Sequence, residues 1–441
     1  MTTTSALSAR PPTLGVQLVV SGAGELANRL AQLCTIAMAG WMLGVSAVGV
    51  IGLAWSLTAI VQALVQGGPE LAGTRLLALA EGTPAEQARI IADVTRLKLM
   101  LALAVAPLLM AIQIALGRND TAALAQLAAQ TAAMIAIGWG YAWAFRGVCR
   151  FIEQGAARGA QAVGSIALLW PLLLVWPSPL AVPVAEILAA LLAVAVTRHR
   201  LWSLMGDCAP SSGRLRPLAV SALTVGFSGV LSALGWLMPI LAAARWAPIE
   251  QISYLTGILR LLLGISGVMH IVLQSLYPLL ARVQAADAVR GRDVTLALTL
   301  QATLATLAGV ILLMATANIM LPLALGPEFI AAVPVFRALA PVLVPLALHL
   351  PLSYALIGRG ETMAVARIQA AVTAAAIVGS LVAFKMAPNA WSVLVLHPVL
   401  WLQAMATMWV FARHNGISRP ANGWGALFDP LTIGRLLHCG L

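Results

Sequence analysis

Charged side chains are scarce in this sequence. Only 9% of its 441 residues are Asp, Glu, Lys or Arg, whereas 61% are hydrophobic and the mean hydropathy is +0.94. Soluble domains carry about 25% charged residues, so a water-soluble core of this size is excluded. Apolar runs of roughly 20 residues recur along the chain, and each can cross about 30 Å of hydrocarbon as a helix. The runs lack the alternation of barrel strands, so we predict an all-α, polytopic membrane protein.

Cysteines and basic runs are also few. The four cysteines are widely spaced, so we expect free thiols, with neither a metal site nor a disulfide framework. The formal net charge is +11, yet no basic run exceeds three residues, so nucleic acid is not an expected partner. The first apolar stretch carries Glu25 and Arg29 and continues to Trp41, which is too long for the core of a cleaved signal peptide. It is the first predicted span.

The positions of the basic residues predict the topology. We place about twelve spans, at residues 13–41, 48–68, 99–117, 122–145, 160–177, 179–197, 217–242, 251–281, 294–318, 330–358, 368–384 and 391–412. With a cytoplasmic amino terminus, 20 of the 26 basic residues fall in inside segments. Only Arg118, Arg245 and Lys385 fall outside. This asymmetry follows the positive-inside rule and places both termini in the cytoplasm.

A polar segment divides the spans into two sets of six. Residues 198–216 contain Pro210, Gly213 and four arginines, as expected of a linker. We therefore predict an N-terminal lobe over 1–197, a cytoplasmic linker over 198–216, a C-terminal lobe over 217–412 and a cytoplasmic tail over 413–441. The second and eighth spans close in a similar way, which indicates a parallel six-plus-six repeat.

Three places in the chain carry a family resemblance. They are Gly44 to Gly49 with Gly68-Pro69-Glu70 to Arg75, then Ile252-Ser253-Tyr254 through Arg260 to Tyr277-Pro278-Leu279-Leu280-Ala281-Arg282, and finally Leu325-Gly326-Pro327-Glu328-Phe329 through Phe336-Arg337 to Ile357-Gly358-Arg359-Gly360. With its twelve-span layout, the chain resembles the multidrug/oligosaccharidyl-lipid/polysaccharide exporter superfamily, and within it the O-antigen and exopolysaccharide repeat-unit flippases. The resemblance implies two lobes in a V shape and alternating access in the bacterial inner membrane.

The same resemblance implies a cargo and partners. The cargo would be a polyprenyl-pyrophosphate-linked oligosaccharide moved from the cytoplasmic to the outer leaflet for lipopolysaccharide or exopolysaccharide synthesis. Candidate partners are membrane lipids, a polysaccharide polymerase and chain-length proteins. The protein would not be an enzyme and would need no cofactor beyond a coupling ion, a proton or sodium.

Five ionisable residues inside the predicted spans are the candidate site. A charge within a span costs at least a few kcal/mol and usually faces a polar cavity. Arg260 lies deepest, about 14 Å into the eighth span, where its guanidinium could bind a pyrophosphate bidentately or bond helix carbonyls. Arg337 and Arg29 are further candidates for the anion, although Arg29 and Glu25 are spaced as a structural ion pair. Glu25 and Glu186 are the candidate coupling carboxylates.

Weaker candidates and rival functions stay open. His270, His349 and His397 lie in separate spans and are more typical of neutral hydrogen-bonding residues. The aromatics that could stack on sugar rings, or anchor helices at the interface, are Trp139, Tyr141, Trp143, Tyr254 and Tyr277. The rival functions are an antiporter for cationic drugs, a membrane enzyme, which the short outer loops disfavour, and a scaffold of a polysaccharide assembly complex.

Overall fold

A computed structural model describes residues 14–79, 84–148, 150–205 and 215–415, and every regular element in these ranges is helical. The long helices are α1 (Leu14–Leu43), α2 (Val45–Gln62), α4 (Pro84–Ala115), α5 (Thr121–Gly138), α7 (Phe151–Val175), α8 (Ala181–Met205), α9 (Leu215–Trp246), α10 (Ile249–Ala286), α11 (Ala288–Leu325), α13 (Leu343–Gly358), α14 (Thr362–Met386) and α15 (Leu396–Asn415). Short pieces extend or interrupt them: η1 (Ala63–Gly67), α3 (Gly68–Leu79), α6 (Ala142–Gly147), η2 (Pro327–Ala332), α12 (Val333–Leu339), η3 (Ala340–Val342) and η4 (Ala390–Val395).

The described helices confirm the all-α membrane architecture. Eleven of them are long and apolar enough to cross a membrane. The 30 residues of α1 are also long enough to span about 30 Å of hydrocarbon. Each predicted span corresponds to one of these twelve passes. Helices α4 and α7 begin furthest ahead of their predicted spans, at Pro84 and Phe151, because the polar residues before each apolar run are also helical.

Local sequence explains where several helices begin and end. The Asp120 side chain accepts a hydrogen bond from the Ala123 amide at the start of α5, and Asp287 caps α11 in the same way. Gly44, with φ of 81°, turns the chain between α1 and α2, and Gly326, with φ of 108°, ends α11. Both glycines have backbone conformations that side chains with a Cβ rarely adopt.

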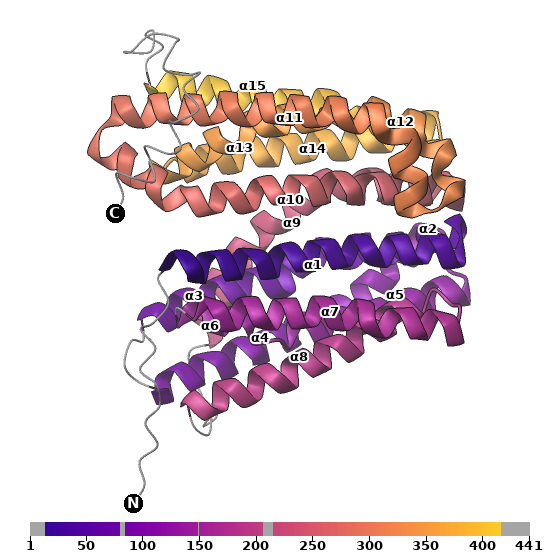
Figure 1. Ribbon diagram of the computed structural model, residues 1–441, viewed down its shortest axis with the longest axis horizontal. Coiled ribbons are helices and arrows are strands. Elements are labelled where there is room, and N and C mark those ends of the chain that lie inside the picture. Colours follow the sequence, from indigo (N-terminus) through magenta and orange to yellow (C-terminus); the bar gives the residue numbers. More distant parts are fainter. Residues whose placement is uncertain (1–13, 80–83, 149, 206–214, 416–441) are drawn as a thin grey trace, which may run out of the picture.

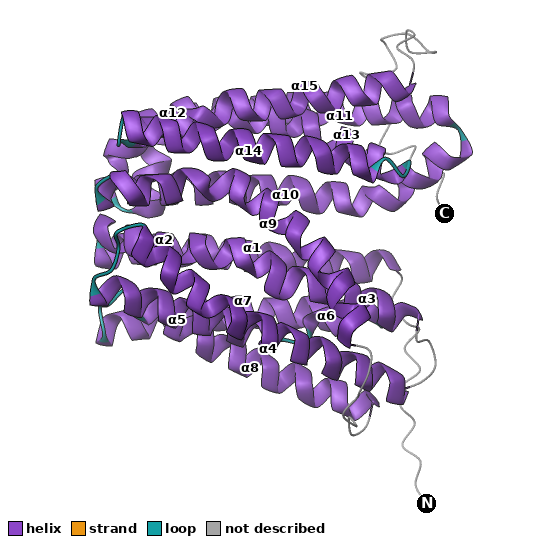
Figure 2. Ribbon diagram, turned by 180° about the vertical axis from the view of Figure 1, so that it is seen from behind, coloured by secondary structure: helices purple, strands orange, loops and turns teal. Residues whose placement is uncertain are grey.

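The helices form two groups, with the chain ends of the described part at one side of the molecule (Figure 1, Figure 2). Helices α1 to α8 make one group and α10 to α15 the other, while α9 crosses between them (Figure 1). We call the end that carries the turns at Gly44, Gly117 and Gly326 the turn end, and the opposite end, where α1 starts and α15 finishes, the terminal end. Helix α9 packs against α14 in one group and against α2 and α3 in the other.

The two groups are joined closely at the turn end. Gly49 and Gly52 of α2 lie directly against Ser253 and Thr256 of α10, and a methyl group at Gly52 would overlap the Thr256 side chain. The Val45 amide donates a 2.8 Å hydrogen bond to Glu328, across the same boundary. Small residues therefore let α2 and α10 approach as membrane helices commonly do, and the V formed by the groups is closed at this end.

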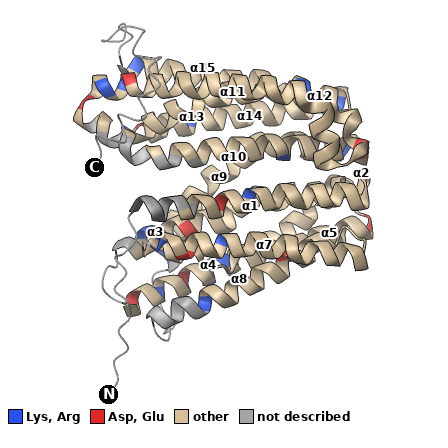
Figure 3. Cartoon of the chain, viewed as in Figure 1, with Lys and Arg blue, Asp and Glu red and all other residues tan. Residues whose placement is uncertain are grey.

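The charged residues are unevenly distributed along the helices. Figure 3 shows most of the coloured basic and acidic residues at the terminal end, with few along the rest of the helices. The predicted linker and tail are only partly covered: α8 continues as helix to Met205, and residues 206–214 and 416–441 lie outside the described part. Of the four cysteines, Cys34 is a free thiol. The other three lie outside the described residues.

Candidate functional site

A cavity of about 690 Å³ lies between the two groups of helices. Its walls are formed by α1, α2, η1, α5, α7, α8, α9, α10 and α13. The lining residues of α1, α2, α9 and α10 all lie nine or more residues from the turn end. At the helical rise, that leaves about 14 Å of packed helix closing the cavity at that end. The cavity is therefore large enough for a sizeable polar head group and is closed on one side.

Arg260 of α10 faces this cavity from the second group of helices. Its guanidinium carbon lies 4.3 Å from the centroid of the Trp55 ring, which belongs to α2 in the first group. Stacking on an indole holds a guanidinium in place without using its N–H donors. No described residue accepts a hydrogen bond from Arg260, so its donors are available to a ligand in the cavity.

Glu186 of α8 provides the counter-charge to Arg260. The two side chains interact electrostatically, and the Trp55 indole also interacts with the Glu186 carboxylate. Gln130 of α5 donates a 2.8 Å hydrogen bond to the same carboxylate. Arg260, Trp55, Glu186 and Gln130 thus form a polar layer that joins the two helix groups inside the cavity, which we call the Arg260 layer.

The Glu25 and Arg29 pair lies at the cavity wall, with 3.5 Å between the Arg29 Nε and a Glu25 carboxylate oxygen. Both side chains are partly open, at 36% and 42% exposure. Arg29 also lies against Gly267 of α10, where a Cβ would come within 3.5 Å of its Nε. Arg29 therefore contacts both groups of helices. Its guanidinium lines the cavity and also pairs with Glu25.

Arg337 lies elsewhere in the molecule. Its Nε donates a 2.9 Å hydrogen bond to the Met314 carbonyl of α11, and it does not line the cavity. Pro334 lies in the first turn of the short helix α12 (Val333–Leu339), and Arg337 in its last turn bonds to α11. The structure therefore brings together four of the five predicted site residues, Glu25, Arg29, Glu186 and Arg260, and not Arg337.

The histidines and aromatics have varied surroundings. His270 lines the cavity, whereas His349 bonds to Thr407 in the second group of helices and His397 bonds to the Ala338 carbonyl. Trp143 is buried among apolar side chains, and Tyr254 packs edge to face on Phe329. Tyr277 has a side chain outside the described set. The aromatics that do line the cavity are Trp55 and Trp236.

Several cavity residues were missed from the sequence. Arg158 of α7 lines the cavity, although the apolar run that predicts its span begins only at residue 160. Gln62 and Gln66 bond to each other at 3.0 Å, and Gln66 donates to the Met134 carbonyl at 2.7 Å. The π-helical turn η1 contains Gln66, and such turns often occur at functional sites. Among the described residues, no His, Cys, Asp and Glu side chains gather as a metal-binding group.

The fold is that of a multi-pass membrane protein with a polar cavity between its two groups of helices. A sequence profile described as polysaccharide biosynthesis protein matches residues 17–284, more than half of the chain. This protein belongs to that family. No curated protein matches the sequence significantly.

Solved structures share the fold over nearly the whole chain. An inward-facing multidrug resistance MATE family transporter of the MOP superfamily aligns with a TM-score of 0.72 and 15% identity, covering 92% of this chain and 98% of its own. The lipid II flippase MurJ, in an inward closed conformation, aligns with a TM-score of 0.68 and 10% identity, covering 95% and 92%. An outward-facing MATE family transporter aligns with a TM-score of 0.57 and 14% identity, covering 92% and 96%. The chain therefore has the fold of these transporters and flippases.

Proposed function

We propose that this protein moves a polyprenyl-pyrophosphate-linked oligosaccharide from the cytoplasmic to the outer leaflet of the bacterial inner membrane. The observation that carries this proposal is Arg260, stacked on Trp55 with its donors directed to a cavity shared by both helix groups. Because a guanidinium stays charged and binds oxyanions through two parallel hydrogen bonds, it suits a pyrophosphate. The family, whose description is polysaccharide biosynthesis, supports a sugar-bearing lipid as the rest of the cargo.

The charge of the cavity supports an anion. Its lining has three arginines, Arg29, Arg158 and Arg260, and two carboxylates, Glu25 and Glu186. Polar amides and the indoles of Trp55 and Trp236 complete the lining and offer hydrogen bonds and stacking surfaces for sugars. Nothing in this set resembles the arrangement of a nucleophile and base that a glycosyl-transfer enzyme needs, and we propose a transport role without chemistry.

The orientation follows from the closed turn end and the distribution of charge. We propose that the terminal end, where the basic residues gather in Figure 3, faces the cytoplasm together with both termini. The cavity is closed at the turn end by the contact of α2 with α10, so this state would accept cargo from the cytoplasmic side. The better overlay on the inward-facing transporter than on the outward-facing one supports this orientation.

The test is the fate of the lipid-linked repeat unit in cells that lack the protein. We expect deletion to trap the repeat unit on the cytoplasmic leaflet, the wild-type gene to restore export, and Arg260→Ala to reduce export at least tenfold. Arg337→Gln is the comparison, because Arg337 is an intramembrane arginine outside the cavity. Normal export by Arg260→Ala, or no trapped intermediate on deletion, would contradict the proposal.

A drug antiporter is the second candidate, because MATE family transporters share the fold. A cationic drug requires carboxylates in excess of basic groups, and this cavity has the reverse. One deletion experiment distinguishes the two candidate functions. An antiporter predicts that deletion sensitises cells to cationic drugs without trapping a lipid-linked sugar, whereas a flippase predicts the trapped sugar.

A further inference from the structure

Two further arginines lie on the α7 side of the cavity, away from the Arg260 layer. Arg158 of α7 lines the cavity, and Arg146 of α6 lies within electrostatic range of it. The Nε atoms of both side chains are buried, and neither donates to a described residue. A buried guanidinium N–H without an acceptor is costly, so this pair of arginines is suited to a ligand that supplies oxygen atoms.

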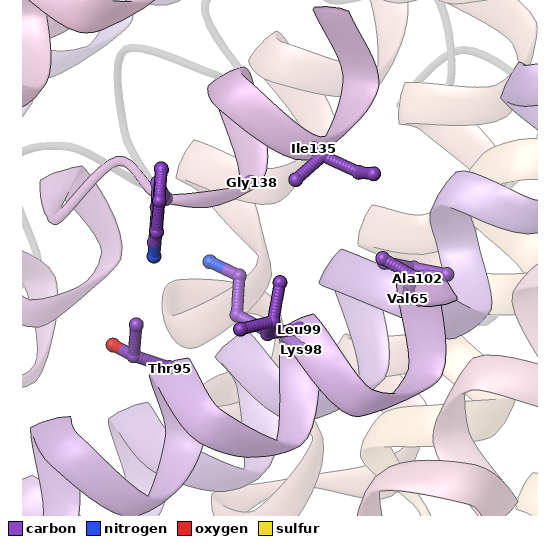
Figure 4. Close-up of a pocket in the computed structure, with 8 residues that line it drawn as sticks. Val65, Thr95, Lys98, Leu99, Ala102, Ile135 and Gly138 are labelled. Carbon is purple, nitrogen blue, oxygen red and sulfur yellow. The ribbon is translucent and has the colours of Figure 1, made fainter. Parts of the chain in front are cut away.

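The acid beside these arginines is already occupied. Glu70 of α3 lies within electrostatic range of Arg146 and Arg158, yet its carboxylate bonds to the Lys98 Nζ at 2.8 Å. Lys98 also lies 5.9 Å from the Trp143 ring centroid. Figure 4 shows Lys98 beside a small pocket under the end of α5, with Ile135 and Gly138 on its far side. Glu70 is therefore shared between Lys98 and the two arginines, and the positive charge of Arg146 and Arg158 is only partly compensated.

The wider group of interacting charged residues around the cavity also has more basic than acidic members. The interactions run from Arg260 to Glu186 and Arg29, then to Glu25, Arg146, Arg158, Glu70 and Lys98. Five members of this group are basic and three are acidic. In a pyrophosphate esterified at both ends, each phosphate carries about one negative charge. The excess of five basic over three acidic groups therefore matches the charge of one such pyrophosphate.

The arginines of the cavity lie at successive depths. Arg260 is 11 residues from the turn end of α10, Arg29 is 14 residues from the turn end of α1, and Arg158 is 17 residues from the turn end of α7. At the helical rise these separations correspond to about 17, 21 and 26 Å. Arg158 is therefore about 9 Å nearer the terminal end than Arg260. An anion that enters from the terminal end meets Arg158 first.

We propose that Arg158, supported by Arg146, is a second phosphate-binding position, which receives the pyrophosphate of the cargo before it reaches Arg260. This inference rests on the proposed direction and class of cargo. Glu25 then acts between the two positions, because it pairs with Arg29 and interacts with Arg146. Each arginine on this path is partly compensated by a nearby carboxylate. A doubly charged head group can therefore move from one arginine to the next, and no single position binds it too tightly to release it.

The experiment is a calorimetric titration of the purified full-length protein with inorganic pyrophosphate. We expect two binding events in the wild type. Arg158→Gln should weaken one event at least tenfold, Arg260→Gln should weaken the other, and the double variant should lose both. Arg245→Gln is the control, because Arg245 is an exposed arginine at the turn end, outside the cavity.

The outcomes separate this position from the proposed function. If Arg158→Gln binds pyrophosphate as the wild type does, in both the wild-type and Arg260→Gln backgrounds, the second position does not exist. If Arg260→Gln alone is without effect, the proposed anchor fails while the Arg158 position stands. Arg158→Lys, which keeps the charge and loses the forked geometry, should bind about threefold more weakly than wild type, and this conservative variant tests the position should Arg158→Gln fold poorly.

A membrane lipid offers the same phosphate chemistry as the cargo. We would therefore repeat the titration in phosphatidylcholine nanodiscs with and without phosphatidylglycerol. The cargo assignment predicts that both binding events persist when the anionic lipid is present. Selective loss of the Arg158-dependent event in phosphatidylglycerol would instead assign the position to a bilayer lipid and overturn its role on the cargo path.

Discussion

Trp55 gives Arg260 its orientation, and the contribution of the ring can be measured separately from that of the charge. Stacking of a guanidinium on an indole contributes roughly 0.5–2 kcal/mol, depending on how far the pair is removed from water. Trp55→Leu removes the aromatic face and keeps an apolar side chain, so we expect pyrophosphate affinity to fall about three- to tenfold. Trp55→Phe should retain most of it. Equal affinities for the Leu and Phe variants, measured by calorimetry, would show that the ring does not position Arg260.

Glu186 competes with any anion for Arg260. Glu186→Gln keeps the shape of the side chain and an acceptor for Gln130, but it removes the negative charge near Arg260. We expect pyrophosphate to bind a few-fold more tightly and export to become slower, because release from Arg260 no longer has a competing carboxylate. If Glu186 also carries the coupling proton, the variant should lose the dependence of export on the proton gradient. Faster export with unchanged affinity would contradict this role.

The loop between α4 and α5 contacts the end of α9 at the turn end through Arg118. Its guanidinium donates to the carbonyls of Ala244, at 2.9 Å, and Ala247, at 2.6 Å, both at the end of α9. Arg118→Ala removes two charge-assisted hydrogen bonds, each contributing about 1.5–3 kcal/mol, from the closed state. We expect the variant to populate a state open at the turn end. Spin labels on the α4–α5 loop and the end of α9 should report longer distances than in wild type.

Arg245→Ala is the matched control for Arg118→Ala, because Arg245 is an exposed arginine in the last turn of α9, at the same end of the molecule. An unchanged distance distribution in Arg118→Ala would show that the contact of α2 with α10 closes the turn end without this loop.

At the level of elements, hydrophobic length and arginine placement were enough to predict the twelve passes. Depth within a span also identified Arg260 and Arg29 as cavity residues. A charged side chain far from both ends of an apolar run cannot easily reach water, so it usually faces a polar cavity. Arg158 was missed because α7 begins about two turns before its apolar run. Arg337 was also predicted from its position inside a span, but its side chain bonds to the Met314 carbonyl of α11, and hydropathy does not report the direction of a side chain.

At the scale of the whole molecule, the proposed transport requires the two groups of helices to separate at the turn end and close at the terminal end. Small residues make the present contact possible: a Cβ at Gly49 would lie 2.5 Å from the Ser253 hydroxyl oxygen. A Cβ at Gly49 would also lie 2.8 Å from the Ile249 carbonyl, so α2 and α10 must move apart slightly to accept a side chain there. After this movement the pair Gly49→Cys and Ser253→Cys, in a protein whose native cysteines are replaced, is within reach of a disulfide that locks α2 to α10. We expect oxidation to stop export of the repeat unit and reductant to restore it to the level of the Gly49→Cys single variant, which measures the effect of the added Cβ alone, while Ser253→Cys exports under both conditions.

The same locked protein separates binding from movement. Because the cavity lies on the terminal side of the crosslink, pyrophosphate should still bind to the oxidised double-cysteine variant with wild-type affinity. Loss of export with retained binding is the result expected if the V opens and closes about a fixed site. Export that continues while α2 and α10 are crosslinked would mean that cargo leaves the cavity by a path that does not open the turn end, and the alternating-access mechanism would then fail for this protein.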